Sequence, residues 1–152
     1  MPDRFRIEDA VQADIPAMVR LLNELFTIEQ DFQPDESRQV AGLSMLLQTP
    51  GQAVIKVARI DNGEAIGMVS AQLVISSAQG TPSAWIEDMV ISLPYRSKGL
   101  GRLLLESALA WARERGASRA QLLVDLDNEP ALGYYERLGW QTSRMGMRRI
   151  LL

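Results

Sequence analysis

The chain has 152 residues, of which 47% are hydrophobic and 23% charged, and its formal net charge is −3. This length and apolar content suit one compact domain with its own core. The sequence has no cysteine and no histidine, which excludes a thiol nucleophile, a disulfide framework, a Ser-His triad and the usual zinc ligands, so we expect no metal.

Apolar periodicity and turn residues predict the elements in chain order. They are a strand at 4–8, helices at 15–26 and 37–47, strands at 53–60, 65–77 and 84–91, a helix at 99–115, a strand at 120–124, a helix at 130–137 and a last strand at 147–152. Asp14 is suited to cap the first helix, and Asp61-Asn62-Gly63 predicts a hairpin turn. A hairpin followed by β-α-β units predicts an α/β fold with a mixed sheet and helices packed on it.

The connection from the strand at 84–91 to the next helix carries the most information. Its turn contains Gly99 and Gly101 beside basic residues. Glycines allow backbone to approach a ligand closely, and the free amides at a helix start favour an anion such as a pyrophosphate. The turn is not a Walker loop, and it lacks the third glycine of the dinucleotide fingerprint. An ordinary glycine turn with solvated basic residues is the alternative.

Two motifs resemble the GNAT superfamily of N-acetyltransferases. Arg96-Ser-Lys-Gly99-Leu-Gly101 is similar to its R/Q-x-x-G-x-G/A signature. Asn128-Glu-Pro-Ala-Leu-Gly-Tyr-Tyr135-Glu-Arg-Leu-Gly-Trp140 resembles its second motif, N-x-x-A-x-x-x-Y-x-x-x-G-F/Y, with tryptophan at the last position. The resemblance implies one N-acetyltransferase domain over residues 1–152. It also implies a mixed, mostly antiparallel sheet flanked by about four helices, with acetyl-CoA held between two splayed strands.

The resemblance also implies roles for matching residues. The backbone of Met89, Val90 and Ile91 would face the pantetheine arm of acetyl-CoA. Its pyrophosphate would be held by the turn residues, namely Arg96, Ser97, Lys98, Gly99, Leu100, Gly101 and Arg102. Asn128 would contact the cofactor. Tyr135 would sit beside its sulfur as the general acid, since a phenol can share a proton with the departing thiolate. The alternative for Tyr135 is a half-buried core residue, and Tyr134 is interpreted as packing.

Carboxylates supply the candidate base and amine site. Strand alternation places Glu87 on one face with Trp85, Met89 and Ile91, and we take Glu87 as the candidate base. A structural ion pair or a solvated edge is the alternative, and a water chain would then take the proton. Glu-Asp at this place also resembles the polyamine and thialysine acetyltransferase branch. The candidate substrate-binding residues are Glu24, Glu29 and Asp88, against the alternative of a solvated helix face.

The leading hypothesis is therefore an acetyl-CoA-dependent N-acetyltransferase. In it a small primary amine (a polyamine, a diamine or an amino-acid-like amine) attacks the thioester directly. Acetylation of a peptide, protein or aminoglycoside amine, and a non-catalytic acyl-CoA-binding sensor, are the alternatives. A sequence pI of about 5.0 disfavours nucleic acid, and no apolar stretch has the length of a membrane span. We expect a cytoplasmic homodimer that covers the apolar last strand.

Overall fold

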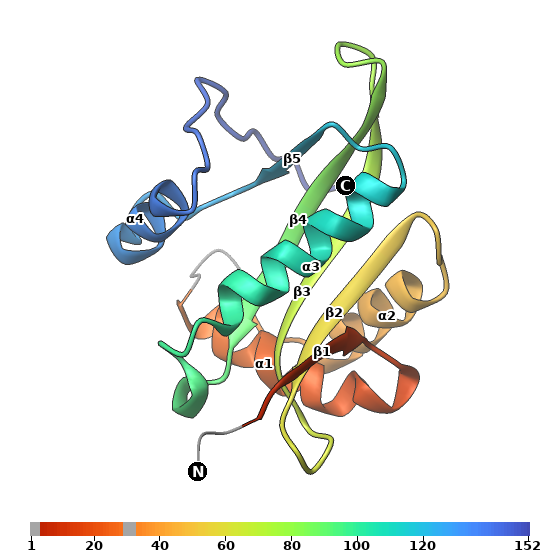
Figure 1. The fold of residues 1–152 in the computed structure, drawn as a ribbon, viewed down its shortest axis with the longest axis vertical. Helices are drawn as coiled ribbons and strands as arrows, with labels where there is room; N and C mark the ends of the chain where they lie inside the picture. The colour runs from red at the N-terminus through yellow and green to blue at the C-terminus, as the bar shows by residue number, and fades with distance from the viewer. Residues whose placement is uncertain (1–3, 29–32) are drawn as a thin grey trace.

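The computed structural model describes residues 4–28 and 33–152 (Figure 1). The elements, in chain order, are β1 (Arg6–Asp9), the 3-10 helix η1 (Gln12–Asp14), α1 (Ile15–Ile28), α2 (Glu36–Leu47), β2 (Ala53–Arg59), β3 (Ala65–Ser76), β4 (Thr81–Ile91), the 3-10 helix η2 (Leu93–Tyr95), α3 (Leu100–Glu114), β5 (Arg119–Leu122) and α4 (Glu129–Arg137). Each predicted element except the last strand is present, with bounds shifted by a few residues.

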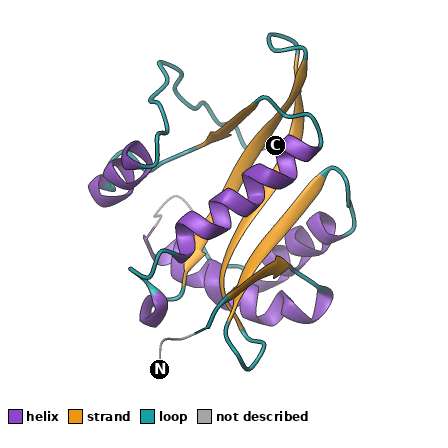
Figure 2. Cartoon of the chain, in the orientation of Figure 1, coloured by secondary structure: helices purple, strands orange, loops and turns teal. Residues whose placement is uncertain are grey.

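The five strands form one sheet in the order β1-β2-β3-β4-β5 (Figure 2). The first three pairs are antiparallel and β4 pairs with β5 in parallel. A parallel neighbour needs a crossover connection, and α3 supplies it between β4 and β5. The prediction of a mixed, mostly antiparallel sheet with four helices is confirmed.

Helices cover both faces of the sheet, and alternation along β2 shows why. Val54 and Ala58 are buried in a cluster with α3, whereas Ile55 and Val57 are buried in a second cluster with α1 and α2. Since successive strand side chains point to opposite faces, β2 contributes to both cores. Figure 1 shows α3 crossing one face while α1 and α2 lie behind the other. In the described part of the chain, no helix combines the length and apolarity that crossing a membrane requires.

Asp14 does not cap α1 in the predicted way. Its carboxylate accepts the N–H of Val11, upstream of the helix, at 2.8 Å. The same carboxylate also accepts two hydrogen bonds from Arg59, at 2.6 and 2.7 Å. Asp14 therefore closes the 3-10 turn and ties the start of α1 to the end of β2. A sequence pattern cannot reveal a partner 45 residues away.

The predicted last strand is wrong. Residues 147–152 have no regular secondary structure, and Ile150 and Leu151 are 83% and 84% exposed. The contiguous apolar residues Ile150, Leu151 and Leu152 lack the alternation of a half-buried strand. The neighbouring edge, β5, is only four residues long and offers few pairing groups.

Candidate functional site

The parallel strands β4 and β5 separate from one another part of the way along. They pair from Ser83 and Arg119 to Ile86 and Leu122. Beyond this point β5 ends, while β4 continues to Ile91. The predicted splayed strand pair is therefore present, and the gap that it leaves opens beside the end of β4.

A cavity of about 310 Å³ occupies this region between β4, α3 and α4. The predicted cofactor-binding residues that line it are Met89, Val90, Ile91, Arg96, Ser97, Gly99, Leu100, Gly101, Asn128 and Tyr135. Lys98 and Arg102 belong to the same turn but are not among its lining residues. Other residues line the cavity without having been predicted to do so from the sequence. They are Leu25, Ile28, Tyr95, Leu123, Val124, Asp125, Ala131 and Tyr134. Helical spacing marks Leu25 only as an apolar position, so the sequence gives no signal for this role.

A bulge in β4 sets which side chains face the cavity. Met68 pairs with Val90 and Ser70 with Glu87, so Asp88 and Met89 together oppose Val69 on β3. Asp88 has a φ of 55°, a left-handed conformation that is unusual for a residue other than glycine.

The bulge reverses the alternation of side chains along the strand. Ile86, Met89 and Ile91 all pack toward the α3 core, and Val90 packs toward α1. The predicted face is therefore wrong: Glu87 lies on the α1 side with Val90, and not with Met89 and Ile91. A one-residue insertion in the pleat moves every later side chain to the other face.

The backbone of Ile91 points into the gap. Ser92 N–H donates to the Ile66 carbonyl of β3 at 2.8 Å. Because hydrogen-bonded and non-hydrogen-bonded pairs alternate in an antiparallel ladder, Ile91 turns its N–H and C=O away from β3. The Ile91 carbonyl accepts a hydrogen bond from Arg96 Nε at 2.7 Å. Arg96 thus fixes the end of β4, and the Ile91 N–H lies on the same side.

The glycines at the start of α3 have distinct roles. Gly99, the N-cap, has a φ of 81°, which glycine adopts without steric cost. The first bond of the helix runs from Leu103 N–H to the Gly99 carbonyl, so the N–H groups before Leu103 have no helical acceptor. At Gly101 a Cβ would meet Met89 Cε at 2.5 Å and Tyr134 Oη at 2.7 Å. The N–H groups at the start of α3 and the helix dipole favour an anion at this end of the helix.

Glu24, a candidate substrate-binding residue, contacts the connection between β4 and α3. Its Oε1 accepts the N–H of Leu93 at 3.2 Å and lies 3.8 Å from Nη2 of Arg96. Its side chain is about one-third exposed. Glu24 therefore links α1 to the residue that holds Ile91.

Three aromatic residues pack together at α4: Tyr134 and Tyr135 lie within the helix, and Trp140 follows its end. Asn128 caps this helix by accepting the N–H of Ala131 at 3.2 Å, which explains the spacing of the motif. The ring of Tyr135 packs edge-on against Tyr134 and Trp140, with centroids 5.3 and 6.0 Å apart. Burial raises the pKa of Tyr134, and nearby Arg102 partly offsets that effect.

Glu87 and Asp88 are not among the residues that line the cavity. The Glu87 carboxylate is exposed and accepts a hydrogen bond from Trp85 Nε1 at 2.6 Å. Asp88 is half-buried at the bulge. Glu29 lies outside the described residues. Within residues 4–28 and 33–152, no group of three acidic, histidine or cysteine side chains is placed to hold a metal ion.

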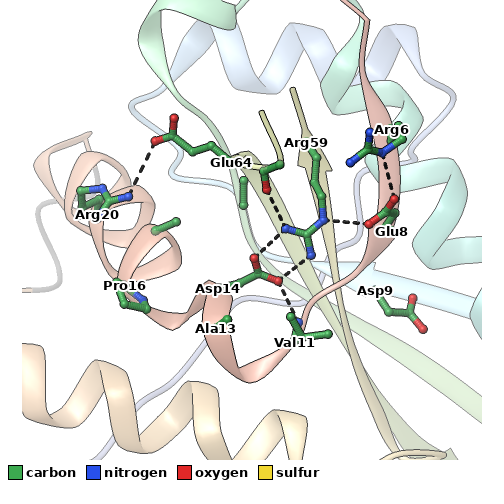
Figure 3. A pocket seen from close by; sticks show the side chains of 13 residues that line it. Arg6, Glu8, Asp9, Val11, Ala13, Asp14, Pro16, Arg20, Arg59 and Glu64 are labelled. Atoms are coloured by element: carbon green, nitrogen blue, oxygen red, sulfur yellow. Dashed lines mark hydrogen bonds and ion pairs between the residues drawn. The ribbon is translucent and has the colours of Figure 1, made fainter. Parts of the chain in front are cut away.

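A second, larger hollow of about 620 Å³ lies around Arg59 (Figure 3). Arg59 is buried and bonds to Asp14, to Glu8 at 2.8 Å and to the Gly63 carbonyl at 3.1 Å. Arg20 lies 3.7 Å from Glu64 in the same hollow. Because these charges are paired with one another, the side chains around Arg59 form a structural clamp that joins β1, β2 and the start of α1.

Comparison with known proteins identifies the chain's relatives. The model of the acetyltransferase (GNAT) family matches residues 15–140. An aminoalkylphosphonate N-acetyltransferase of Salmonella typhimurium is 26% identical over 145 residues, which cover 95% of this chain and 90% of that protein. An uncharacterised N-acetyltransferase of Archaeoglobus fulgidus is 28% identical, with 86% and 89% covered. Matches to three other curated relatives span only 21–36% of those proteins' lengths.

The fold also has solved counterparts. The aminoglycoside N-acetyltransferase AAC(6')-Iy in complex with CoA superposes with a TM-score of 0.82. Its sequence is 18% identical, and the alignment covers 99% of this chain and 97% of that one. At this identity the likeness establishes the fold alone.

Proposed function

Because the chain belongs to the GNAT family of acetyltransferases, we propose that it transfers an acetyl group from acetyl-CoA to a primary amine. The observation that carries this proposal is the cavity at the splayed end of β4 and β5, which brings both sequence motifs together. One wall holds the start of α3 and the other holds Tyr135 of α4. We propose that residues 1–152 act as one catalytic domain.

Acetyl-CoA suits the residues of this cavity. The free N–H groups at the start of α3, with Arg96 nearby, suit an anionic group such as a pyrophosphate. The absence of a Cβ at Gly101 lets Met89 and the Tyr134 hydroxyl pack directly against the start of α3. Met89, Val90 and Ile91 form a strand edge without a partner on β5, beside which the amides of a pantetheine arm would lie. Lys98 and Arg102, outside the lining, would add positive charge, and Asn128 would contact the donor from α4.

The proposed chemistry needs two groups at the thioester. The amine nitrogen attacks the carbonyl carbon, and Ile91 N–H donates to the oxygen as negative charge develops there. The carbon–sulfur bond then breaks. Tyr135 gives its hydroxyl proton to the sulfur and is reprotonated from solvent, so the products are CoA and the acetylated amine. Two observations support this role for Tyr135. The residue lines the cavity, and its ring packs against the rings of Tyr134 and Trp140.

We propose Glu87 as the base that receives the proton of the amine. Its carboxylate lies on the α1 side of β4, the side from which Val90 lines the cavity. Because Glu87 itself is outside the lining, the proton would reach it through water.

We propose a small primary amine as acceptor, with polyamines, diamines and amino-acid-like amines first, in line with the diamine acetyltransferase branch. Leu25 and Ile28 line the cavity, so the end of α1 borders the acceptor side. Carboxylates would attract a cationic amine to this side, and Glu24 of α1, Asp88 of β4 and Glu29, which is outside the described residues, are the proposed contacts. The relatives named above act on an aminoalkylphosphonate and an aminoglycoside, so these amines belong in the test.

The test is incubation with acetyl-CoA and an amine panel while a thiol reagent reports free CoA. The protein has no cysteine and adds no background. The panel holds spermidine, putrescine, lysine, thialysine, an aminoalkylphosphonate, an aminoglycoside and short peptides. Amine-dependent release with a diamine or polyamine is expected. Release only with a peptide or an aminoglycoside would overturn the acceptor class. Binding of acetyl-CoA without any release would favour an acyl-CoA sensor.

We further propose that the protein is a cytoplasmic homodimer. Support for a dimer comes from the exposed apolar residues Ile150, Leu151 and Leu152, which a second copy would cover. A cytoplasmic location follows from the need for acetyl-CoA. Sedimentation of the purified protein tests the dimer, and a single species at the monomer mass would overturn it.

A further inference from the structure

Tyr134 occupies a position that packing alone does not explain. It lines the cavity, and its hydroxyl oxygen is 2.7 Å from where a Cβ on Gly101 would lie. Neighbouring residues on a helix point about 100° apart, so Tyr134 and Tyr135 face different parts of the cavity. Tyr134 faces the start of α3, where the N–H groups lack acceptors.

The Tyr134 hydroxyl is suited to donate. None of the described residues forms a hydrogen bond with it, although its ring is half-buried. Among the described residues, the one fully buried side-chain oxygen or nitrogen without a partner belongs to Gln39. The Tyr134 oxygen is therefore open to the cavity that the residue lines, where a ligand can reach it. A tyrosine hydroxyl is protonated at neutral pH and can donate, and burial, which raises the pKa of Tyr134, does not change this.

We propose that the Tyr134 hydroxyl donates a hydrogen bond to a pyrophosphate oxygen of the CoA donor at the start of α3. This inference rests on the proposed function and deepens it. The two adjacent tyrosines divide the work: Tyr134 recognises the donor, whereas Tyr135 supplies the proton to sulfur. Gly101 then has a second purpose, because its missing Cβ leaves space for the Tyr134 hydroxyl.

The experiment measures CoA affinity by calorimetry, together with kcat and KM for acetyl-CoA, in the wild type and in Tyr134→Phe. A hydrogen bond to a charged acceptor predicts a Kd about 10- to 100-fold weaker in Tyr134→Phe. KM should rise in parallel while kcat changes little. Tyr135→Phe should show the opposite pattern, with kcat lowered and Kd retained. Thermal unfolding of Tyr134→Phe checks that the phenyl ring preserves the packing.

The outcomes separate the two proposals. If the wild type binds no CoA, the proposed function fails. If the wild type and Tyr134→Phe bind CoA equally, only the role of Tyr134 is overturned. Tyr134→Leu extends the test, because equal binding in Tyr134→Phe with loss in Tyr134→Leu would assign Tyr134 to packing. A fall in kcat with unchanged Kd in Tyr134→Phe would also overturn the proposal.

Discussion

Replacing Asp14 by asparagine should destabilise the protein strongly, because it breaks the clamp shown in Figure 3. Asp14 is 7% exposed and Arg59 8% exposed. The Asp14 carboxylate accepts two hydrogen bonds from Arg59 and one from Val11 N–H. Asparagine keeps one acceptor oxygen, but it removes the negative charge and one acceptor beside the buried guanidinium, whose remaining partners include Glu8 and the Gly63 carbonyl.

Removing one partner of a buried ion pair costs about 3–5 kcal/mol, chiefly because the other charge stays buried with less compensation. For a chain of this size, that loss lowers Tm by about 6–20 °C. Thermal and urea unfolding followed by circular dichroism would measure it. The matched control is Glu8→Gln, which removes an Arg59 partner whose side chain is 44% exposed, so its effect should be smaller. Equal Tm values for Asp14→Asn and Glu8→Gln would refute the reasoning.

The same clamp predicts a dependence of stability on pH. Hydrogen bonds from Arg59 lower the pKa of Glu8. Burial alone would raise the pKa of Asp14, but bonds from Arg59 and Val11 outweigh it and lower that pKa below 3.8. A carboxyl with a lowered folded pKa stabilises the fold above its unfolded pKa and loses this effect as pH falls through the folded value. The wild type should therefore lose stability below about pH 4 more steeply than Asp14→Asn. Parallel curves would contradict this account.

Two further changes test the cavity. Gly101→Ala should push Met89 and Tyr134 into the donor site and weaken CoA binding by tenfold or more, while stability changes by less than about 1 kcal/mol because alanine favours the helix. An unchanged Kd in calorimetry would remove the start of α3 from the donor site. Glu24→Gln should raise KM for a cationic amine by up to about fivefold, with CoA affinity retained. A loss of CoA affinity instead would assign Glu24 to holding Arg96.

Sequence patterns were sufficient for the four helices, for every predicted strand except the last, and for the part of the Arg96–Arg102 turn that lines the cavity. These features depend on local periodicity and on glycine spacing, which neighbouring residues determine. The mixed character of the sheet followed from the hairpin and the β-α-β units. The lining role of Tyr135 and Asn128 was likewise accessible, because α4 positions both through one motif.

Long-range geometry accounts for what the sequence did not reveal. The bulge at Asp88 moved Glu87 to the opposite face from Met89, and strict alternation could not anticipate an extra residue. Tyr134 was interpreted as packing because its contact with Gly101 depends on how α4 lies against α3. The contact between Glu24 and Arg96 joins residues that are 72 positions apart in the sequence (96 − 24 = 72), so no local pattern predicts it.

We propose above all that Tyr135 acts as the general acid of acetyl transfer in the cavity at the splayed end of β4 and β5. The most direct measurement is kcat for CoA release by the wild type and Tyr135→Phe, with acetyl-CoA and the best amine of the panel. Loss of a general acid predicts a fall of about 100-fold or more, with CoA affinity and Tm retained. Equal kcat values would contradict the account.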